Sequence, residues 1–236
     1  MDLSQSKVKI FVDTADLTLL RQYADHPRVQ GATTNPSLLS KAGVTTYTDF
    51  IREVLAIFPD RPVSLEVLGD DHETMRRQAL TLAAAGSNVY VKIPAFNSQG
   101  APSFDLIREL SLSGVKINCT AVMDPRTIDD ACSALATSTP SILSVFAGRI
   151  SDAGYDVLPT MRRAVCTARG LPIEVLWAST REIYNVIEAE ECSVHIITLF
   201  PSFLDKLPQF GRDLREYEIE TSRQFLEDSK IAGFTL

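Results

Sequence analysis

Short apolar runs alternate with amphipathic segments along most of the chain. Runs of four to eight apolar, often β-branched residues predict buried strands, and apolar residues at helical spacing predict helices. The predicted strands are residues 8–12, 29–32, 63–67, 89–94, 115–120, 141–147, 173–178 and 194–199. Helices are predicted at 17–24, 47–58, 73–86, 104–112, 128–135 and 157–169. Eight strands that alternate with helices along the chain favour an α/β fold with one closed parallel (β/α)8 TIM barrel over an open sheet.

The pattern changes near the end of the chain. Residues 213–228 predict a helix rich in charge, and the closing residues 231–236 are apolar. No Gly/Ser linker, low-complexity segment or solenoid repeat interrupts the chain, so residues 1–236 are interpreted as one barrel domain. Residues 209–236 are interpreted as a C-terminal helical tail that packs on a neighbouring subunit, which predicts a homo-oligomer.

One strand carries a charge where the pattern demands an apolar residue. Lys92 lies within the run Val89-Tyr90-Val91-Lys92-Ile93-Pro94, and Pro94 cannot donate to a sheet, so the strand should end there. A buried ammonium is costly. The side chain must therefore reach water, pair with a carboxylate, or lose its proton and become a nucleophile. The carboxyl-terminal rim of a parallel barrel is where such chemistry is done, but a structural lysine paired across the sheet fits this segment equally well.

Other polar side chains fall at the ends of predicted strands. Glu66 is predicted to lie at the centre of the strand 63–67, where, like Lys92, it would be a charged group in a buried strand, so the two should project into one polar pocket. Asp13 ends the first strand; Asp16 or Thr14 can cap the next helix, which leaves Asp13 free to point into the barrel mouth. Asn35 precedes Pro36 and is either a helix cap or a ligand-binding amide. The remaining candidates at strand ends are Asn118, Thr120, Ser144, Phe146, Arg149, Ser179 and Arg181.

The composition of the chain disfavours several classes of binding partner. The chain has 23 basic and 30 acidic residues and a net charge of -7, which disfavours nucleic acid and anionic membranes and requires local cations for any phosphate. The N-terminal residues contain no signal-peptide core and no apolar run is long enough to span a membrane, so a cytoplasmic location is expected. Four widely spaced cysteines and three scattered histidines predict reduced thiols and neither a metal site nor a cofactor.

Together these side chains favour carbon–carbon bond chemistry. Lys92 offers a Schiff base as the electron sink for cleavage beside a ketone, and the arginines suit phosphate. Six segments also resemble the motifs of the transaldolase family, in order and over nearly the whole chain: Phe11–Asp16, Thr33–Leu38, Val91–Pro94, Asn118–Thr120, Phe146–Arg149 and Ala178–Arg181. Length and terminal helix resemble its short-chain, fructose-6-phosphate aldolase-like branch, in which decameric barrels are common.

The resemblance implies roles. Lys92 would form an imine with the keto carbon of a ketose phosphate, and Asp13 would take the proton of the C4 hydroxyl as the C3–C4 bond breaks. Glu66 and Thr120 would hold the water that shuttles protons. Asn35 and Asn118 would bind sugar hydroxyls, and Arg149, Ser179 and Arg181 the phosphate. The dihydroxyacetone unit left on Lys92 would then add to an acceptor aldose phosphate.

Two positions bear on the alternative of an aldolase that releases free dihydroxyacetone. Glu66 and Phe146 resemble transaldolase, whereas the aldolase members have Gln and Tyr there. Phe146 offers no hydroxyl to protonate the enamine intermediate, which favours transfer to an acceptor. A third interpretation, a barrel that binds sugar phosphates without turnover, fits the complete set of Lys92, Asp13 and Glu66 poorly.

The chain also departs from the family. Residues 95–102 lack the usual Thr and Glu-Gly pair, which makes the loop expected over the site unusual, and Trp177 and Thr180 stand where a small residue and Phe are common. Trp177 either fills the core or reshapes the pocket. These changes leave open the donor and acceptor sugars, and whether the pathway is central pentose phosphate metabolism or a specialised one.

Overall fold

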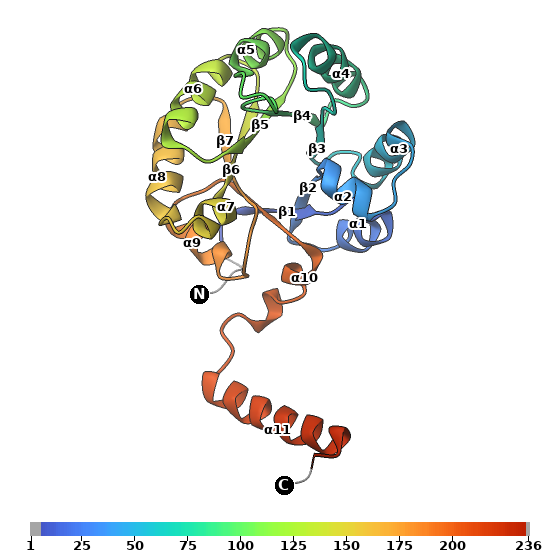
Figure 1. Cartoon of the computed structure of the whole chain (residues 1–236), viewed down its shortest axis with the longest axis vertical. Helices are drawn as coiled ribbons and strands as arrows, with labels where there is room; N and C mark the ends of the chain where they lie inside the picture. Colours follow the sequence, from blue (N-terminus) through green and yellow to red (C-terminus); the bar gives the residue numbers. More distant parts are fainter. Residues whose placement is uncertain (1–5, 235–236) are drawn as a thin grey trace.

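Eight parallel strands pair in sequence order and close into a barrel in the computed structural model, which describes residues 6–234. The strands are β1 (Lys9–Asp13), β2 (Val29–Thr33), β3 (Val63–Glu66), β4 (Val89–Pro94), β5 (Ile117–Val122), β6 (Ser141–Phe146), β7 (Ile173–Ala178) and β8 (Ile196–Leu199). Figure 1 shows this ring of strands from one end, with helices around the outside. The predicted (β/α)8 barrel is therefore confirmed.

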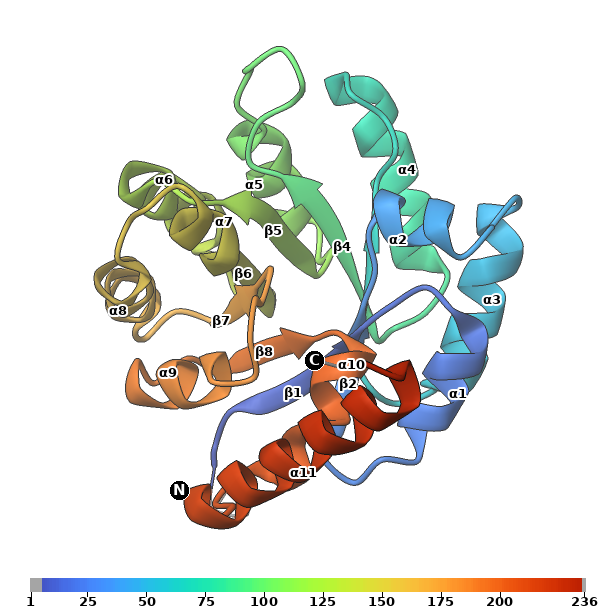
Figure 2. The same cartoon turned by 60° about the horizontal axis from the view of Figure 1, so that its bottom comes forward.

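Helices follow every strand. They are α1 (Leu17–Ala24), α2 (Pro36–Lys41), α3 (Tyr47–Ile57), α4 (His72–Ala84), α5 (Phe104–Leu112), α6 (Pro125–Leu135), α7 (Ala147–Asp152), α8 (Val157–Ala168), α9 (Asn185–Glu191), α10 (Pro201–Leu204) and α11 (Leu214–Ala232), with a short 3-10 turn, η2 (Leu207–Gln209). Figure 2 shows how α1–α9 surround the barrel. Many begin at an acidic or amide residue whose side chain accepts a backbone N–H, as Asp16 does for α1 and Asn35 for α2.

Two layers of apolar side chains fill the molecule. The larger cluster lies between strands and helices, and the smaller one, within the barrel, consists of Phe11, Ile142, Leu176, Ala178 and Ile196. Because strand side chains alternate between the two faces, Leu176 and Ala178 belong to the inner cluster while Trp177 between them belongs to the outer one. Trp177 is 1% exposed and so fills the core, the first of its two interpretations.

Several predicted boundaries were wrong. The fifth strand begins at Ile117 and not at Val115, and the eighth begins at Ile196 and not at Val194, because the register with the neighbouring strands starts at these residues. Glu66 ends β3 instead of occupying its centre. The short helices α7, α9 and α10 were not predicted. α7 starts directly at the end of β6, so the sequence gives no loop between them.

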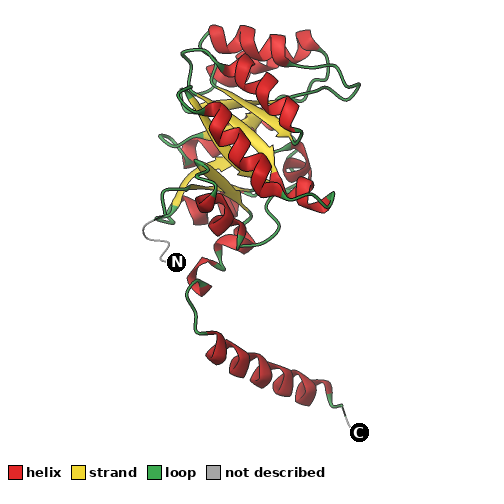
Figure 3. Cartoon of the chain, turned by 90° about the vertical axis from the view of Figure 1, so that its left-hand side faces the viewer, coloured by secondary structure: helices red, strands yellow, loops and turns green. Residues whose placement is uncertain are grey.

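Helix α11 stands apart from the barrel (Figures 1 and 3). None of its 19 residues is buried, although it carries large apolar side chains. The most exposed of these are Leu214, Phe225 and Leu226, with Ile231 near the helix end. The predicted tail helix is thus confirmed, while residues 235–236 of the apolar closing segment lie outside the described residues. Among the described residues, no helix combines the length and apolar character needed to cross a membrane.

Candidate active site

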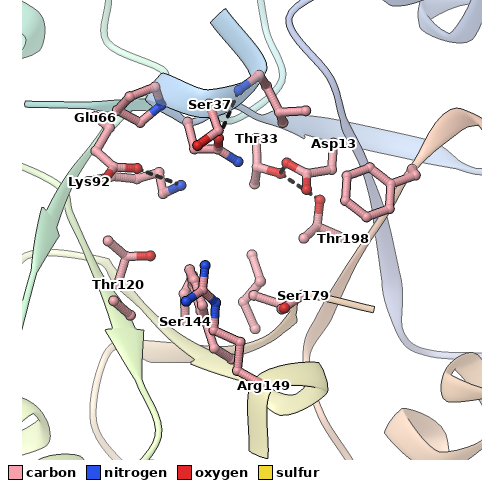
Figure 4. A pocket seen from close by; sticks show the side chains of 18 of the residues that line it. Asp13, Thr33, Ser37, Glu66, Lys92, Thr120, Ser144, Arg149, Ser179 and Thr198 are labelled. Carbon is pink, nitrogen blue, oxygen red and sulfur yellow. Dashed lines mark hydrogen bonds and ion pairs between the residues drawn. The ribbon is translucent and has the colours of Figure 1, made fainter. Parts of the chain in front are cut away.

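A cavity of about 470 Å³ opens at the carboxyl ends of the strands. Its lining includes residues from β1 to β8, and Figure 4 shows their side chains converging on one space. Of the residues predicted as site candidates, all but Asn118 line it: Asp13, Asn35, Glu66, Lys92, Thr120, Ser144, Phe146, Arg149, Ser179 and Arg181. The topology therefore brings together in space side chains that are up to 168 positions apart in the sequence.

Lys92 lies in the floor of this cavity and is only 5% exposed. Strands β3 and β4 pair Glu66 with Lys92 directly, which places Glu66 Oε2 3.0 Å from Lys92 Nζ. Lys92 Nζ also donates a hydrogen bond to the carbonyl oxygen of Thr34, at 2.7 Å. The amine is thus withdrawn from bulk water and paired, and the prediction that Glu66 and Lys92 share one pocket is confirmed.

Asp13 lines the cavity from the end of β1 and is also buried. As predicted, it is not needed as a cap, because Asp16 accepts the first N–H groups of α1. Its Oδ1 accepts a hydrogen bond from Thr33 Oγ1 at 2.8 Å, and Thr198 Oγ1 lies 2.5 Å from that same hydroxyl (Figure 4). Burial raises the pKa of the Asp13 carboxyl, while the charge of Lys92 and the Thr33 hydrogen bond act in the opposite direction.

Three candidates on β5 and β6 take different positions. Thr120 lines the cavity, and its buried hydroxyl has no hydrogen-bond partner within residues 6–234, so both its donor and acceptor face the cavity. Asn118 is fully buried beneath the lining, where its Nδ2 donates to Ser64 Oγ at 3.0 Å and its Oδ1 accepts from Ser144 Oγ at 2.7 Å. Asn118 therefore holds Ser144, and only Ser144 reaches the cavity.

Asn35 combines the two interpretations that its sequence context left open. Its Oδ1 accepts from the backbone N–H of Leu38 at 3.0 Å and so caps α2. The residue also lines the cavity, and within residues 6–234 its Nδ2 has no hydrogen-bond partner. The same amide can therefore begin a helix and still donate to a bound molecule.

Two arginines follow β6 and β7, across the barrel from β2, which precedes Asn35. Arg149 belongs to α7 and lies over the ring of Phe146, 5.8 Å from its centroid. Arg181 follows β7 and pairs with Asp152 at the end of α7. Both guanidiniums are exposed, and both line the cavity together with Ser179. Planar guanidiniums at the rim of a cavity are suited to a phosphate group.

The segments that carry these arginines touch through their main chains. A Cβ atom at Gly148 would come within 1.7 Å of the carbonyl oxygen of Ser179, so only glycine fits there. Ser179 itself has a left-handed backbone, with φ of 63°, and so does Ala121, with φ of 59°. Both residues line the cavity. Sparsely populated backbone conformations of this kind often mark functional sites.

The unusual loop after Lys92 does not lie over the cavity, contrary to expectation. None of residues 95–102 lines it. Instead, Ser98 donates from both its backbone N–H and its hydroxyl to the carboxylate of Asp70, which ties this loop to the one after β3. Thr180 is likewise turned away from the cavity and donates to the carbonyl oxygen of Thr198.

Some lining residues were not singled out from the sequence. Thr33 and Thr198 join Asp13, and Ser37 and Lys41 project from α2 with a spacing of one helical turn. Threonine within a strand is too ordinary to mark a site, although Thr33 stands in the segment Thr33-Thr34-Asn35 that carried the family resemblance. Within the described part of the chain, no three His, Cys, Asp or Glu side chains are grouped to hold a metal ion.

Comparison with known proteins agrees with this geometry. Residues 10–235 match the family described as "Transaldolase/Fructose-6-phosphate aldolase". A "Probable transaldolase" of Methanococcus maripaludis is 35% identical over 223 residues, which cover 94% of this chain and 97% of that protein. "Probable transaldolase 2" of Listeria monocytogenes is 33% identical over 202 residues, or 85% and 88% of the two chains.

Solved structures show the same fold at low sequence identity. The YdjI aldolase of Escherichia coli K12 has a TM-score of 0.53 and 13% identity, covering 82% of this chain and 75% of that one. Thiamine phosphate pyrophosphorylase of Pyrococcus furiosus has a TM-score of 0.55 and 14% identity, covering 83% and 86%. The chain thus has the barrel of these enzymes, and by its sequence it belongs to the transaldolase/fructose-6-phosphate aldolase family.

Proposed function

We propose that this enzyme is a transaldolase, which moves a dihydroxyacetone unit from a ketose phosphate to an aldose phosphate through a Schiff base on Lys92. The observation that carries the proposal is the pair of buried Lys92 and partly buried Glu66, 3.0 Å apart, in a cavity whose rim bears two guanidiniums. A lysine removed from water beside a proton acceptor is placed to attack a carbonyl carbon.

Imine formation needs two proton movements. Glu66 accepts a proton from Lys92, whose nitrogen then bonds to the keto carbon to give a carbinolamine. The departing hydroxyl of that carbinolamine leaves as water once it is protonated. Glu66 and the unpartnered hydroxyl of Thr120 stand on the two sides of Lys92, on β3 and β5, and together they support a water that carries this proton.

Cleavage then uses the second carboxylate. Asp13 takes the proton of the C4 hydroxyl, the C3–C4 electron pair moves into the iminium, and an aldose phosphate departs. The enamine of dihydroxyacetone remains on Lys92. An acceptor aldose phosphate receives the new C–C bond as Asp13 returns the proton, and hydrolysis of the second imine frees the product ketose. Asn35 Nδ2 and the Ser144 hydroxyl, held by Asn118, bind sugar hydroxyls, while Arg149, Ser179 and Arg181 bind the phosphate.

Borohydride reduction tests the covalent step. Incubation with a hexulose 6-phosphate and borohydride should fix one substrate fragment to each chain, and peptide mass spectrometry should locate it on Lys92. The Lys92→Ala variant should not be labelled. An adduct that persists in this variant contradicts the Schiff base, and a wild-type protein that forms none is instead a barrel that binds sugar phosphates without turnover.

Transfer and simple cleavage differ in the fate of the enamine. Phe146 lines the cavity and brings no hydroxyl to protonate that intermediate, which supports transfer. Assays with and without an acceptor aldose phosphate separate the two activities: turnover should depend on the acceptor. Phe146→Tyr should raise the release of free dihydroxyacetone, while Phe146→Leu should not. Equal turnover without acceptor in the wild type favours the aldolase alternative.

We also propose that the enzyme works as a homo-oligomer, in keeping with the decameric barrels common in its branch. The support is α11, whose exposed apolar side chains include Phe225 at 68% and Ile231 at 81%. Exposed apolar side chains gathered on one element indicate an interaction surface. Light scattering coupled to size exclusion should give a mass several times 26.0 kDa, and Phe225→Glu with Ile231→Glu should lower it. A wild-type chain that stays monomeric contradicts this assignment.

A further inference from the structure

Arg181 has little of its guanidinium left for a ligand. Its Nε donates to Asp152 Oδ1 at 3.0 Å, and its Nη2 donates to Asp152 Oδ2 at 2.5 Å. Its Nη1 donates to the carbonyl oxygen of Ser179 at 2.9 Å and to the Ser179 hydroxyl at 3.0 Å. A guanidinium has five N–H groups. These contacts use four of them and leave one N–H of Nη2.

The guanidinium of Arg149, in contrast to that of Arg181, keeps its N–H groups available for a ligand. Within residues 6–234 this guanidinium makes no hydrogen bond or ion pair and lies over the ring of Phe146. Arg149 lies on α7 three residues before Asp152 and lines the cavity together with Arg181, while Asp152 does not line the cavity and reaches the site through its pairing with Arg181. Hydrogen bonds from Arg181 hold the pKa of Asp152 below its usual range, with a smaller contribution from the charge of Arg149. The carboxylate is therefore charged at neutral pH.

We propose that Asp152 is a positioning residue that binds Arg181 in competition with the substrate phosphate and so weakens phosphate binding at this site. This inference rests on the proposed transaldolase function and deepens it. Arg149 is then the principal phosphate ligand, and Arg181 contributes a single N–H together with the free hydrogen of the Ser179 hydroxyl. Asp152 reduces the positive charge of the pair from two to one.

The reaction explains why weaker binding is useful. After cleavage the dihydroxyacetone unit stays covalently on Lys92, while the aldose phosphate must leave and a second one must enter the same phosphate site. Binding energy that holds substrate and product equally does not speed the chemical step. A phosphate site at full strength would retain the first product and delay the exchange, whereas a carboxylate beside Arg181 lowers that affinity.

Asp152→Asn tests the charge while it keeps the size of the side chain and one carbonyl acceptor for Arg181. The competitive inhibition constant of inorganic phosphate should fall by about two- to fivefold, which is the size expected for one exposed charge. The ratio of kcat/KM for a hexulose 6-phosphate to that for the free hexulose should rise by a similar factor. A general loss of structure would weaken phosphate binding. Tighter binding in this variant can therefore be attributed to the removed charge.

Two further variants sharpen the test. Asp129→Asn makes the same change in another exposed Asp–Arg pair, with Arg163, outside the cavity lining, and should leave the inhibition constant unchanged. In an Arg181→Ala background, Asp152→Asn should change the constant much less than in the wild type. An Asp152→Asn enzyme with equal or weaker phosphate binding overturns the inference, and so does a full effect without Arg181.

The inference can fail separately from the proposed function. If Arg149→Ala leaves phosphate inhibition unchanged, the phosphate site is elsewhere and the role of Asp152 falls with it, although the adduct on Lys92 still stands. If Arg149→Ala weakens inhibition and Asp152→Asn does not strengthen it, only the role of Asp152 is lost.

Discussion

Ionisable side chains are buried on one side of the cavity and exposed on the other. On one side Lys92 and Asp13 are no more than 9% exposed, and each is hydrogen-bonded at the end of β2, Lys92 to the carbonyl oxygen of Thr34 and Asp13 to the hydroxyl of Thr33. On the other side Arg149 and Arg181 lie at the exposed rim. Buried side chains withdrawn from water suit bond making, whereas exposed guanidiniums suit the binding of a phosphate. Changes on the buried side should therefore affect kcat, and changes at the rim should affect KM.

Lys92→Ala should have the largest effect. Without the amine no imine forms, and kcat should fall by about 10⁴-fold or more, as expected when a nucleophile is removed. Steady-state assays with a hexulose 6-phosphate and an acceptor measure the loss. Lys41→Ala, at an exposed lysine of the same cavity, is the matched control and should retain kcat within about tenfold. Comparable losses in both variants would contradict the distinction between the two sides.

Asp13→Asn should lower the activity and raise the stability of the enzyme. The loss of the general base should lower kcat by about 10²- to 10⁴-fold while the adduct on Lys92 still forms. Because burial raises the pKa of Asp13, its charged form costs stability once the pH exceeds that raised value, and this cost is absent at a pH below 3.8. The neutral amide should therefore raise the melting temperature at neutral pH. A variant that melts lower than wild type would contradict this sign.

The ionisation of Asp13 also predicts how kcat/KM falls at acid pH. Asp13 must be deprotonated to accept the C4 proton, so kcat/KM should decline as the pH falls through a value above 3.8. Thr33→Val removes the hydrogen bond that opposes the raised pKa and should move this limb to still higher pH. A limb that stays in place in this variant would show that another group controls it.

Arg149→Ala should act mainly on binding. KM for a ketose phosphate should rise by about 10- to 100-fold, which corresponds to one charge-assisted hydrogen-bond partner, with a small change in kcat. The free hexulose should be turned over as by wild type. Arg181→Ala should raise KM less, because most of that guanidinium is already bound within the protein. Equal effects on the phosphorylated and free sugars would place Arg149 outside the phosphate site.

Gly148→Ala should have the smallest effect on turnover. The added methyl group meets the Ser179 carbonyl oxygen, so α7 must shift, at a cost of about 1–3 kcal/mol. The shift moves Arg149 relative to Ser179, and KM should rise a few-fold with kcat almost unchanged. Gly154→Ala, whose added Cβ would meet no atom within 4 Å, controls for glycine loss, although its left-handed backbone makes some destabilisation inherent. A larger kcat effect at Gly148 would mean that the two sides are coupled.

The sequence predicted the buried side better than the rim. Lys92 and Glu66 stood out because a charge within an apolar strand has few explanations, and the sheet register then placed them side by side. The depth of Asn118 could not be predicted, since its position on the same face as Thr120 did not reveal that it lies one layer deeper. Helix α7 was missed because it is short and contains Gly148. Asp152 could not be recognised at all, because its pairing with Arg181 depends on the contact between α7 and the end of β7.

The hydrogen bonds of Lys92 set a limit on the covalent intermediate. As an ammonium the nitrogen can donate three N–H groups, and it directs two toward Glu66 and the Thr34 carbonyl. A protonated imine retains only one. When the sugar is attached, the nitrogen can therefore donate to only one of these two acceptors. The Thr34 carbonyl oxygen cannot become protonated to make up for the loss of its hydrogen bond. The Glu66 carboxylate can accept a proton. Formation of the bond between Lys92 and the sugar therefore releases Glu66, which can then hydrogen-bond to the water that later hydrolyses this bond.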